Sequence, residues 1–385
     1  MSRSRGRSPR IRKARGASAV GQRHEVEVGP VAHGGHFVAR VPTAAPDSAQ
    51  GETRVVFVRH ALPGERVVVE IIEGTEGDRF WRADAVEVLQ AAPDRVAAPC
   101  PYAGPGLCGG CDFQHVALDA QRRLKADVVR EQLRRVAGLD VEVVVEAVPG
   151  DEEGLHWRTR QRYVRLPDGG LGMRKHRSHE VVPVDTCLIE APTGPSYDVH
   201  EHHFEVADGG FWQVHPGAPS ALVDAVLAAL APRAGESVLD LYAGVGLFSR
   251  FLSDAVGPTG RVAVVEGDRA ASALSERNCP GVSAHAGDVA AVLADGLPPE
   301  WGSADLVVLD PPRVGAKRAV VEQVVARSPR AVAYVACDPA ALARDLATFA
   351  EHGYRLGSLR AFDLFPMTHH VECVALLVRS DFGPR

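Results

Sequence analysis

Apolar and polar positions follow different rhythms along the 385 residues of this chain. Between residues 20 and 90, short apolar runs are separated by Gly, Pro and Asp, which is typical of a small β-barrel. The clearest of these runs are Glu25–Val28, His36–Val41, Thr53–Val58 and Glu65–Ile72. From about residue 205 onward, wholly apolar runs alternate with Ala- and Leu-rich stretches. Because strands of that kind are covered on both faces, we expect a doubly wound parallel α/β sheet.

The apolar runs place the individual elements. We expect sheet strands at Ser237–Leu241, Arg261–Glu266, Leu306–Asp310 and Ala331–Ala336, and a final strand at Val374–Val378. Residues 118–136 carry apolar side chains near helical spacing and predict a helix. The pattern therefore predicts a basic tail (1–19), a β-barrel (20–90), a small central α+β domain (91–204) and a sheet domain (205–385).

Charge and composition narrow the setting. The first 15 residues hold seven Arg or Lys and no acid, so this tail either contacts phosphates or only aids solubility. It lacks the apolar centre of a secretion signal, and no apolar run reaches about 18 residues, so we expect a cytoplasmic protein without a membrane partner. In the cytoplasm the seven cysteines should stay reduced. The net charge of −6 argues against non-specific coating of nucleic acid.

A cofactor site is predicted where the first sheet strand ends. Gly244 and Gly246 form a Gly-x-Gly turn between a strand and a helix, which lets the backbone approach a ligand. Glu266 closes the next strand, where its carboxylate could accept hydrogen bonds from both ribose hydroxyls. Asp288 ends the expected third strand and could reach an adenine. Ser249 stands where a dinucleotide-binding motif has its third glycine, which favours AdoMet over NAD.

The motif Asp310-Pro311-Pro312-Arg313 allows one kind of methyl transfer. Enzymes that methylate amino groups use Asp/Asn-Pro-Pro followed by an aromatic residue that stacks on the target base. Arg313 occupies the aromatic position here. Methylation of an exocyclic amine is therefore our second choice.

Cys337 supports a different reaction. It follows the strand Ala331–Ala336, at the edge where doubly wound sheets bind ligands, although a lone cysteine is more often an inert core residue. Carbon 5 of uracil is a poor nucleophile, but addition of a thiolate to carbon 6 makes carbon 5 electron-rich. A base must then remove the proton from carbon 5, and Glu372, just before the last strand, matches that role. The reaction leads us to expect a depressed thiol pKa at Cys337.

Taken together, these motifs resemble the RNA 5-methyluridine methyltransferase family, over nearly the whole chain from about residue 20. The resemblance implies a class I AdoMet methyltransferase fold preceded by an OB-like, RNA-binding TRAM barrel, whose recognisable stretch here is Leu62–Val67. It also implies covalent catalysis by Cys337 in Tyr334–Pro339, with Glu372 as the base that ends Asp363–Glu372. The AdoMet-binding positions that it implies are Gln213, in Phe211–His215, and Tyr242, Glu266 and Asp310.

Four positions depart from the family pattern: His215, Leu247, Ala336 and Asp338. Asp338 matters most, because a negative charge beside Cys337 opposes thiolate formation unless it is paired or turned away. These departures leave a second class of function open, an RNA-binding or assembly factor that has lost its activity. We expect catalysis, because the nucleophile and the base are both retained.

A second set of cysteines predicts a metal site. Cys100, Cys108, Cys111 and Cys187 offer four thiolates, which suit either tetrahedral zinc or an iron–sulfur cluster. Their spacing differs from that of radical-AdoMet enzymes. Resemblance to cluster-bearing family members favours [4Fe-4S] with a structural or RNA-positioning role. His200, His202 and His203 fit no ligand spacing and predict an exposed turn.

RNA is the expected partner. Residues 157–163, with sequence WRTRQRY, alternate cationic and other side chains, and strand alternation would place Arg158, Arg160 and Arg162 on one face. The combination of barrel and cysteines resembles rRNA-modifying members, so 23S rRNA is favoured and tRNA remains possible. We expect a monomer.

Overall fold

A computed structural model describes residues 16–42 and 53–380, so the expected basic tail falls almost entirely outside the described residues. Internal contacts divide the chain into two compact units. One comprises residues 1–96 with 104–107, and the other residues 97–103 with 108–385. The finer division into a central domain and a sheet domain stays a prediction. Over the described parts of the chain, no helix has the length and apolar character needed to cross a membrane.

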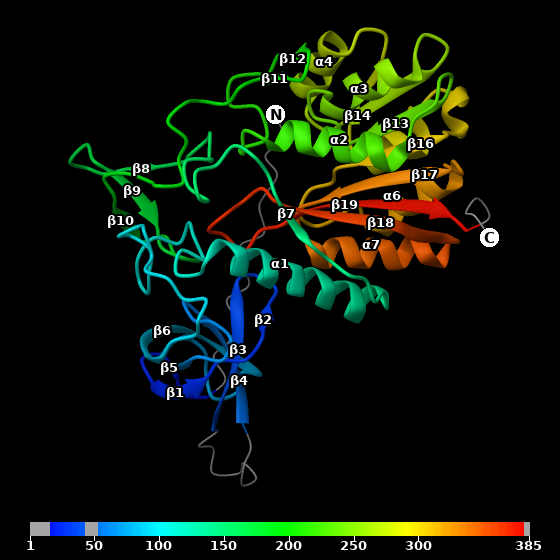
Figure 1. Cartoon of the computed structure of the whole chain (residues 1–385). Coiled ribbons are helices and arrows are strands. Elements are labelled where there is room, and N and C mark those ends of the chain that lie inside the picture. Colours follow the sequence, from blue (N-terminus) through cyan, green and yellow to red (C-terminus); the bar gives the residue numbers. More distant parts are fainter. Residues whose placement is uncertain (1–15, 43–52, 381–385) are drawn as a thin grey trace. The chain divides into compact units, whose positions relative to one another are not determined.

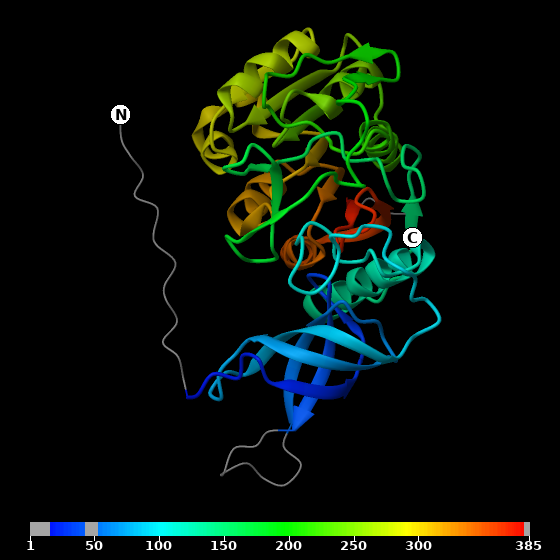
Figure 2. The ribbon, with the colours of Figure 1, turned by 90° about the vertical axis from the view of Figure 1, so that its left-hand side faces the viewer.

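The first unit is a curled six-stranded sheet, in which β1 also contacts β3 (Figure 2). Its spatial order is β1-β5-β6-β4-β3-β2, and all neighbours are antiparallel except β4 and β6. Alternate side chains are buried along β3 and β5, which confirms the predicted barrel. The strands are β1 (Arg23–Glu27), β2 (Val31–Ala32), β3 (His36–Pro42), β4 (Thr53–Arg59), β5 (Arg66–Glu73) and β6 (Phe80–Gln90).

Glu65 holds the stretch Leu62–Val67 of this barrel in place. Its fully buried carboxylate accepts a hydrogen bond from the Leu62 amide at 2.8 Å and pairs with Arg95 at 2.5 Å. Burial alone would raise the pKa of Glu65, but the Arg95 guanidinium and the backbone donors bring it below its ordinary value. The buried carboxylate of Glu65 therefore stabilises the turn at residues 62–65 from the interior of the barrel.

The second unit contains an eight-stranded sheet of order β15-β14-β13-β16-β17-β19-β18-β7 (Figure 1). Only β19 runs opposite to its neighbours β17 and β18. The strands are β7 (Val145–Ala147), β13 (Ser237–Leu241), β14 (Arg261–Glu266), β15 (Ser283–Ala286), β16 (Leu306–Leu309), β17 (Ala331–Ala336), β18 (Tyr354–Asp363) and β19 (Glu372–Arg379). The predicted doubly wound sheet is confirmed, but the last strand begins at Glu372, two residues earlier than expected.

Helices cover both faces of the sheet (Figure 1). Apolar side chains of α2, α3 and α4 share a core with one face, and those of α1, α6 and α7 share a core with the other. The predicted helix ends earlier than expected as α-helix and continues as a π-helical turn, Leu133–Ala137, which Gly138 closes at φ 67°. The helices are α1 (Leu118–Gln132), α2 (Ala218–Leu230), α3 (Leu247–Val256), α4 (Arg269–Asn278), α5 (Val289–Ala291), α6 (Lys317–Ala326) and α7 (Pro339–Glu351).

The segment 157–163 differs from its prediction, since it forms no strand apart from an isolated bridge at Arg158. Arg160 donates hydrogen bonds to the carbonyls of Gly209 and Gly210, and Arg158 donates to the carbonyl of Arg160. The three arginines therefore do not line one strand face. The cause is tertiary, because backbone carbonyls of a distant segment bind the guanidinium of Arg160.

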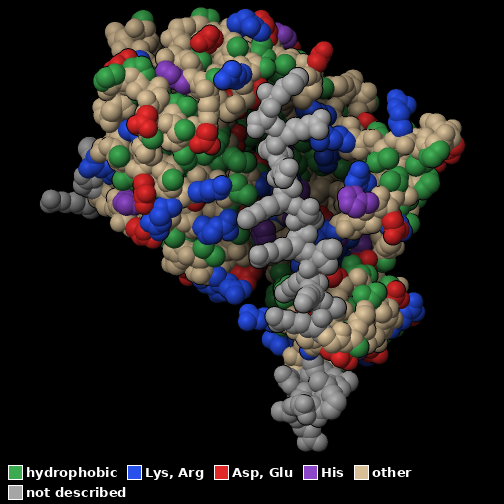
Figure 3. All heavy atoms as spheres, turned by 180° about the vertical axis from the view of Figure 1, so that it is seen from behind, with side chains coloured by type: hydrophobic (Ala, Val, Ile, Leu, Met, Phe, Trp, Pro, Cys, Tyr) green, Lys and Arg blue, Asp and Glu red, His purple; other side chains and the backbone are tan. Residues whose placement is uncertain are grey.

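Small β-structures complete this unit. β8, β9 and β10 form a three-stranded antiparallel sheet, and β11 and β12 form a short hairpin. Figure 3 shows both basic and acidic side chains on the face of the molecule seen there. The strands are β8 (Val164–Arg165), β9 (Leu171–Arg174), β10 (Val181–Pro183), β11 (Asp198–Val199) and β12 (His202–His203).

Candidate active site

The cofactor residues gather where the strand order reverses beside β13, the usual ligand site of a doubly wound sheet. Gly244 and Gly246 both have positive φ, at 57° and 89°. A Cβ atom on Gly244 would meet no other atom within 4 Å, so the turn is open there to a ligand. A Cβ atom on Gly246 would lie 2.7 Å from Sγ of Cys279. The first glycine leaves room for a ligand and the second leaves room for the core.

Glu266 connects the glycine turn with the loop after β14. Its carboxylate accepts hydrogen bonds from the amides of Gly244 at 2.8 Å and Asp268 at 2.7 Å. These two donors orient the carboxylate at the carboxyl edge of the sheet. Asp288 caps the short helix α5 by accepting a hydrogen bond from the Ala291 amide at 3.1 Å. The predicted ribose residue thus ends β14, and the predicted adenine residue caps the helix that follows the neighbouring strand β15.

Tyr242 and Ser249 flank the glycine turn. Tyr242 adopts φ 64°, an unusual conformation for a non-glycine residue, and burial together with the charge of Asp288 raises its pKa to about 12. The hydroxyl of Ser249 donates a hydrogen bond to the buried carboxylate of Asp240. Burial raises the pKa of Asp240 to about 7. Ser249, which stands where a dinucleotide-binding motif has its third glycine, therefore donates a hydrogen bond to the carboxyl group of Asp240 inside the sheet.

Asp310 links the cofactor residues to the catalytic candidates. Burial raises its pKa to about 7, and the charges of Asp240 and Glu266 act in the same direction. The negative charge of Asp310 also raises the pKa of Cys337 and of Glu372. One carboxyl group is thus close enough to influence both sets of residues.

Cys337 and Glu372 lie at one end of two paired strands. Ala336 of β17 pairs with Cys373 of β19, so Cys337 and Glu372, the adjacent residues, come opposite each other. Glu372 is buried with 5% of its surface exposed, whereas Cys337 is half-buried. Burial raises the pKa of Glu372 well above its ordinary value, with Asp310 adding to the shift and Arg313 opposing it.

The expectation of a depressed thiol pKa is wrong for the protein without ligands. Burial raises the pKa of Cys337 to about 12, and the charges of Glu372, Asp310 and Asp338 add to this effect. Arg313 opposes them with its positive charge. Burial and the charges of three carboxyl groups therefore favour the neutral thiol.

Asp338 has a structural task that accounts for its charge. Its carboxylate caps α7 by accepting a hydrogen bond from the Ala341 amide at 2.7 Å, and Pro339 occupies the first helical position. Among the charges that act on the pKa of Cys337, that of Asp338 has the smallest effect. The Asp338 carboxylate, whose charge opposes thiolate formation at Cys337, is therefore bound at the N-terminus of α7.

The four predicted metal-ligating cysteines line one cavity of about 30 Å³. All four are half-buried thiols outside disulfide bonds, although they come from three separate stretches of chain. Amide groups point at the sulfur atoms, since Gln161 donates to Cys187 at 3.0 Å and Gln114 donates to Cys111 at 3.4 Å. Without a bound cation, burial raises the pKa of the Cys111 thiol to about 12. The cavity thus combines four thiol groups with donors that would stabilise thiolates.

The predicted exposed turn at His200–His203 is the β11–β12 hairpin, in which each histidine pairs with a different carboxylate. His200 contacts Asp224 at 2.9 Å, His202 contacts Asp254 at 2.8 Å and His203 contacts Asp198 at 2.7 Å. Within the described residues, the only three such ligand atoms within 4.8 Å of one another belong to Glu201, His202 and Asp254. Arg250 pairs with Asp254 at 3.3 Å and already supplies a cation there.

Comparisons with known proteins bear on these residues. A family model described as tRNA (Uracil-5-)-methyltransferase matches residues 301–380, and a TRAM domain model matches residues 17–86. An uncharacterized RNA methyltransferase of Streptomyces avermitilis is 44% identical, over 93% of this chain and 98% of the relative. A 23S rRNA (uracil(1939)-C(5))-methyltransferase of Shewanella sp. (strain MR-4) is 30% identical, over 85% of this chain and 92% of the relative.

The chain belongs to the RNA uracil-C5-methyltransferase family. A solved structure supports the fold assignment. The tRNA (uracil-54, C5)-methyltransferase of Pyrococcus abyssi, in complex with S-adenosyl-L-homocysteine, has a TM-score of 0.66 and 19% identity over 92% of this chain and 99% of that one. The protein is thus an AdoMet-dependent RNA methyltransferase with a class I fold and a TRAM barrel.

Two further departures from the family pattern, His215 and Leu247, lie in the core. His215 is fully buried and stacks on Trp157 with ring centroids 6.0 Å apart, and its Nδ1 accepts a hydrogen bond from the Gly217 amide at 3.1 Å. Leu247, which is 7% exposed, belongs to the same core as Trp212. The predicted cofactor residue Gln213 is half-buried and follows Trp212 directly. The next residue, Val214, accepts hydrogen bonds from Thr159 through its carbonyl. Leu247 and His215 both contribute to packing.

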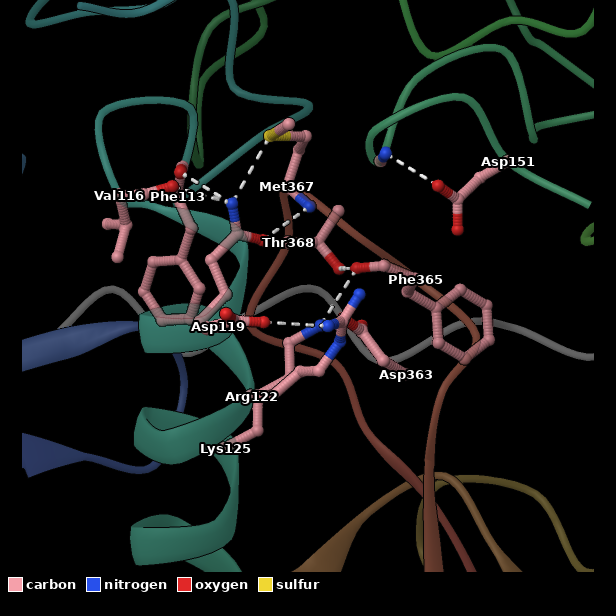
Figure 4. A network of polar contacts seen from close by, with 12 residues as sticks. Phe113, Val116, Asp119, Arg122, Lys125, Asp151, Asp363, Phe365, Met367 and Thr368 are labelled. Carbon is pink, nitrogen blue, oxygen red and sulfur yellow. Dashed lines mark hydrogen bonds and ion pairs between the residues drawn. The ribbon is translucent and has the colours of Figure 1, made fainter. Parts of the chain in front are cut away.

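Sequence reasoning gave no role to a buried polar face of α1. Gln121 and Lys125 are 0% and 1% exposed, four residues apart on the helix. Lys125 pairs with Asp363 at 2.5 Å, as Figure 4 shows. The available signal was their position on the apolar face, together with Leu124 and Val128.

Proposed function

We propose that this methyltransferase transfers a methyl group from AdoMet to carbon 5 of a uridine in 23S rRNA, with Cys337 as nucleophile and Glu372 as base. The observation that carries the proposal is the position of Cys337 opposite Glu372, with Asp310 close to both. The charge of Glu266 also raises the pKa of Asp310. Asp310 therefore lies near both the Cys337–Glu372 pair and the proposed cofactor residues. A nucleophile, a base and a cofactor site at one sheet edge are the groups this reaction needs.

The chemistry assigns one task to each side chain. AdoMet, when bound, supplies the electrophilic methyl group. The thiol of Cys337, which is only half-buried, gives its proton to solvent, and the sulfur atom then bonds to carbon 6 of the ring, which moves an electron pair toward carbon 5. After carbon 5 has been methylated, the Glu372 carboxylate takes the proton from that carbon, the bond between sulfur and carbon 6 breaks, and the thiolate leaves. A raised Glu372 pKa suits a base that must bind this proton.

The residues present fit AdoMet. Gly244 leaves open space beside the backbone, and the oriented carboxylate of Glu266 can accept hydrogen bonds from ribose hydroxyls. Tyr242, Asp288, Gly246 and Gln213 complete the proposed cofactor set. The target base must leave its stack to reach a half-buried thiol, as expected of an enzyme that modifies a base within structured RNA.

We further propose that Cys100, Cys108, Cys111 and Cys187 hold a [4Fe-4S] cluster. The four thiols line one cavity and suit either tetrahedral zinc or an iron–sulfur cluster, and the resemblance to cluster-bearing family members favours the cluster. The cluster would fix the surrounding segments rather than take part in methyl transfer.

Metal analysis of the purified protein decides between the two metals. Protein prepared without oxygen should contain about four iron and four sulfide per chain and absorb broadly near 400 nm. Cys111→Ser should lose the absorption. A colourless wild type with one zinc per chain would reverse the assignment.

An RNA adduct tests the proposed mechanism. Wild-type enzyme should form a covalent complex with RNA containing 5-fluorouridine, because fluorine at carbon 5 cannot leave as a proton. Cys337→Ala should form no complex and no 5-methyluridine, while it keeps its affinity for AdoMet. A complex that persists in Cys337→Ala would remove this residue from the mechanism. An amino-methyltransferase would yield a different methylated nucleoside from natural RNA.

Mapping 5-methyluridine identifies the RNA. The relatives include enzymes named for 23S rRNA, and the combination of barrel and cysteines favours the same substrate. Deleting the gene should remove one 5-methyluridine from 23S rRNA and leave tRNA unchanged. Loss of the modification from tRNA alone would reassign the substrate.

A further inference from the structure

The loop between β18 and β19 delivers Glu372 to the active site. It spans residues 364–371, and Leu364, Met367 and Val371 in it are 0%, 5% and 1% exposed. Met367 adopts φ 64°, a conformation that a non-glycine residue holds only when its surroundings enforce it. The loop therefore depends on contacts from other segments.

Helix α1 provides the first set of contacts (Figure 4). The Gln121 side chain accepts a hydrogen bond from the Met367 amide at 2.8 Å and donates to the Val116 carbonyl at 2.9 Å. Lys125 donates to Asp363 at 2.5 Å and to the Phe365 carbonyl at 3.0 Å. These contacts hold the first half of the loop.

The cysteine segment provides the second set, through the residue that follows Cys111. The amides of Asp112 and Phe113 both donate to the Met367 carbonyl, each at 3.0 Å. The Asp112 carboxylate accepts from the His369 amide at 3.2 Å and contacts Nδ1 of His369 at 2.5 Å. Asp112 is 8% exposed, so these bonds are shielded from water.

The next residue, His370, extends the connection to the active site. Its Nε2 lies 3.2 Å from the guanidinium of Arg313. Burial, followed by the charges of His369 and Arg313, lowers the pKa of His370 to about 3, so the ring is neutral and accepts the hydrogen bond. Arg313 is the cation that acts on both Cys337 and Glu372. A movement of His369 would therefore displace Arg313 through the contact between His370 and Arg313. It would displace Glu372 through the backbone that joins the two residues.

We infer that Asp112 is a positioning residue for proton removal: by holding Met367 and His369, it sets where Glu372 and Arg313 stand relative to Cys337. This inference rests on the proposed function. It makes the last step of the reaction depend on the cysteine-bearing segment, with no direct contact between that segment and the reacting atoms.

The ratio of covalent adduct to product separates positioning from a merely structural role. Loss of folded protein lowers both quantities together. A misplaced base slows only the breakdown of the adduct, so the adduct with natural RNA accumulates. For Asp112→Ala we expect product formation to fall about 10- to 100-fold, as small misplacements of catalytic groups do, while adduct formation persists.

Matched variants sharpen the test. Asp112→Asn keeps an oxygen that accepts from the His369 amide and should restore most of the product. Asp127→Ala removes an exposed carboxylate that pairs with Arg130, and its adduct-to-product ratio should equal that of wild type. Equal losses of adduct and product in Asp112→Ala, with unchanged metal content and AdoMet affinity, would overturn the inference.

His369→Ala decides the question if Asp112→Ala loses its metal or does not fold. It removes the partner of the Asp112 carboxylate without changing the cysteine segment, and its side chain is 25% exposed. An unchanged adduct-to-product ratio in this variant would also overturn the inference. Failure of the proposed function looks different, because wild-type enzyme would then form no adduct with 5-fluorouridine RNA.

Discussion

Cys337 and Glu372 face each other across the pairing of β17 with β19, although they lie 35 positions apart in the sequence. The reversed direction of β19 makes this possible. Because β19 runs opposite to β17, its first residue lies at the edge where β17 ends. A parallel final strand would have placed Glu372 at the other edge, far from the nucleophile.

Glu372→Gln should trap the enzyme on its substrate. The amide cannot take the proton from carbon 5, so we expect 5-methyluridine release to fall about 10²- to 10⁴-fold while a covalent complex with natural RNA accumulates. Denaturing gels and nucleoside analysis measure the two quantities. Glu351→Gln is the control, because Glu351 is an exposed partner of Arg318. Normal turnover in Glu372→Gln would refute its role as the base.

The thiol of Cys337 should react as a weak acid in the free protein. Because its pKa is raised to about 12, the thiolate fraction should increase about tenfold for each pH unit between 7 and 10. Alkylation by iodoacetamide, followed by mass spectrometry of the Cys337 peptide, should show that slope. Arg313→Gln should slow the alkylation, since the arginine charge lowers this pKa. A rate that levels off near pH 8 would contradict the prediction.

Lys125→Ala should destabilise the second unit. The substitution leaves Asp363, which is 1% exposed, without its principal partner, and losing one member of a buried ion pair costs about 3–5 kcal/mol. Arg122, at 3.4 Å from Asp363, should reduce that cost. We expect a lower thermal unfolding midpoint in Lys125→Ala and a partial recovery in the double variant Lys125→Met/Asp363→Leu. Additive losses in the double variant would show that the two residues do not act as a pair.

Gly246→Ala should weaken AdoMet binding. The added methyl group would lie 2.7 Å from Sγ of Cys279, and φ 89° costs a non-glycine residue about 1–2 kcal/mol. Calorimetric titration with S-adenosyl-L-homocysteine should show a loss of affinity of at least about tenfold. Gly281→Ala is the control, because it has a similar φ of 92° but no atom within 4 Å of the new methyl group. Equal affinities in the two variants would mean that strain, and not the glycine turn, determines the effect.

Local patterns in the sequence determined the sheet, the glycine turn and the two catalytic candidates. The strands Ser237–Leu241 and Ala331–Ala336 match their predicted bounds, because a strand buried on both faces is apolar throughout and needs no distant partner to be recognised. Cys337 and Glu372 could be picked out as candidates because Cys337 follows the strand Ala331–Ala336 and Glu372 precedes the apolar run Val374–Val378. The cysteine quartet was predictable from the close pair Cys108 and Cys111.

Only the tertiary structure decided how those residues behave. The raised pKa of Cys337 results from burial and from the carboxyl groups of Glu372 and Asp310, which come from two other segments. The irregular backbone at Arg160 results from carbonyls about fifty residues away. Lys125 lies on the apolar face of α1, but the sequence does not reveal that its partner is the buried carboxylate of Asp363. Periodicity and turn chemistry act over a few neighbouring residues, so the sequence reveals them. Burial and charge depend on which distant segments meet, and the folded chain alone establishes that.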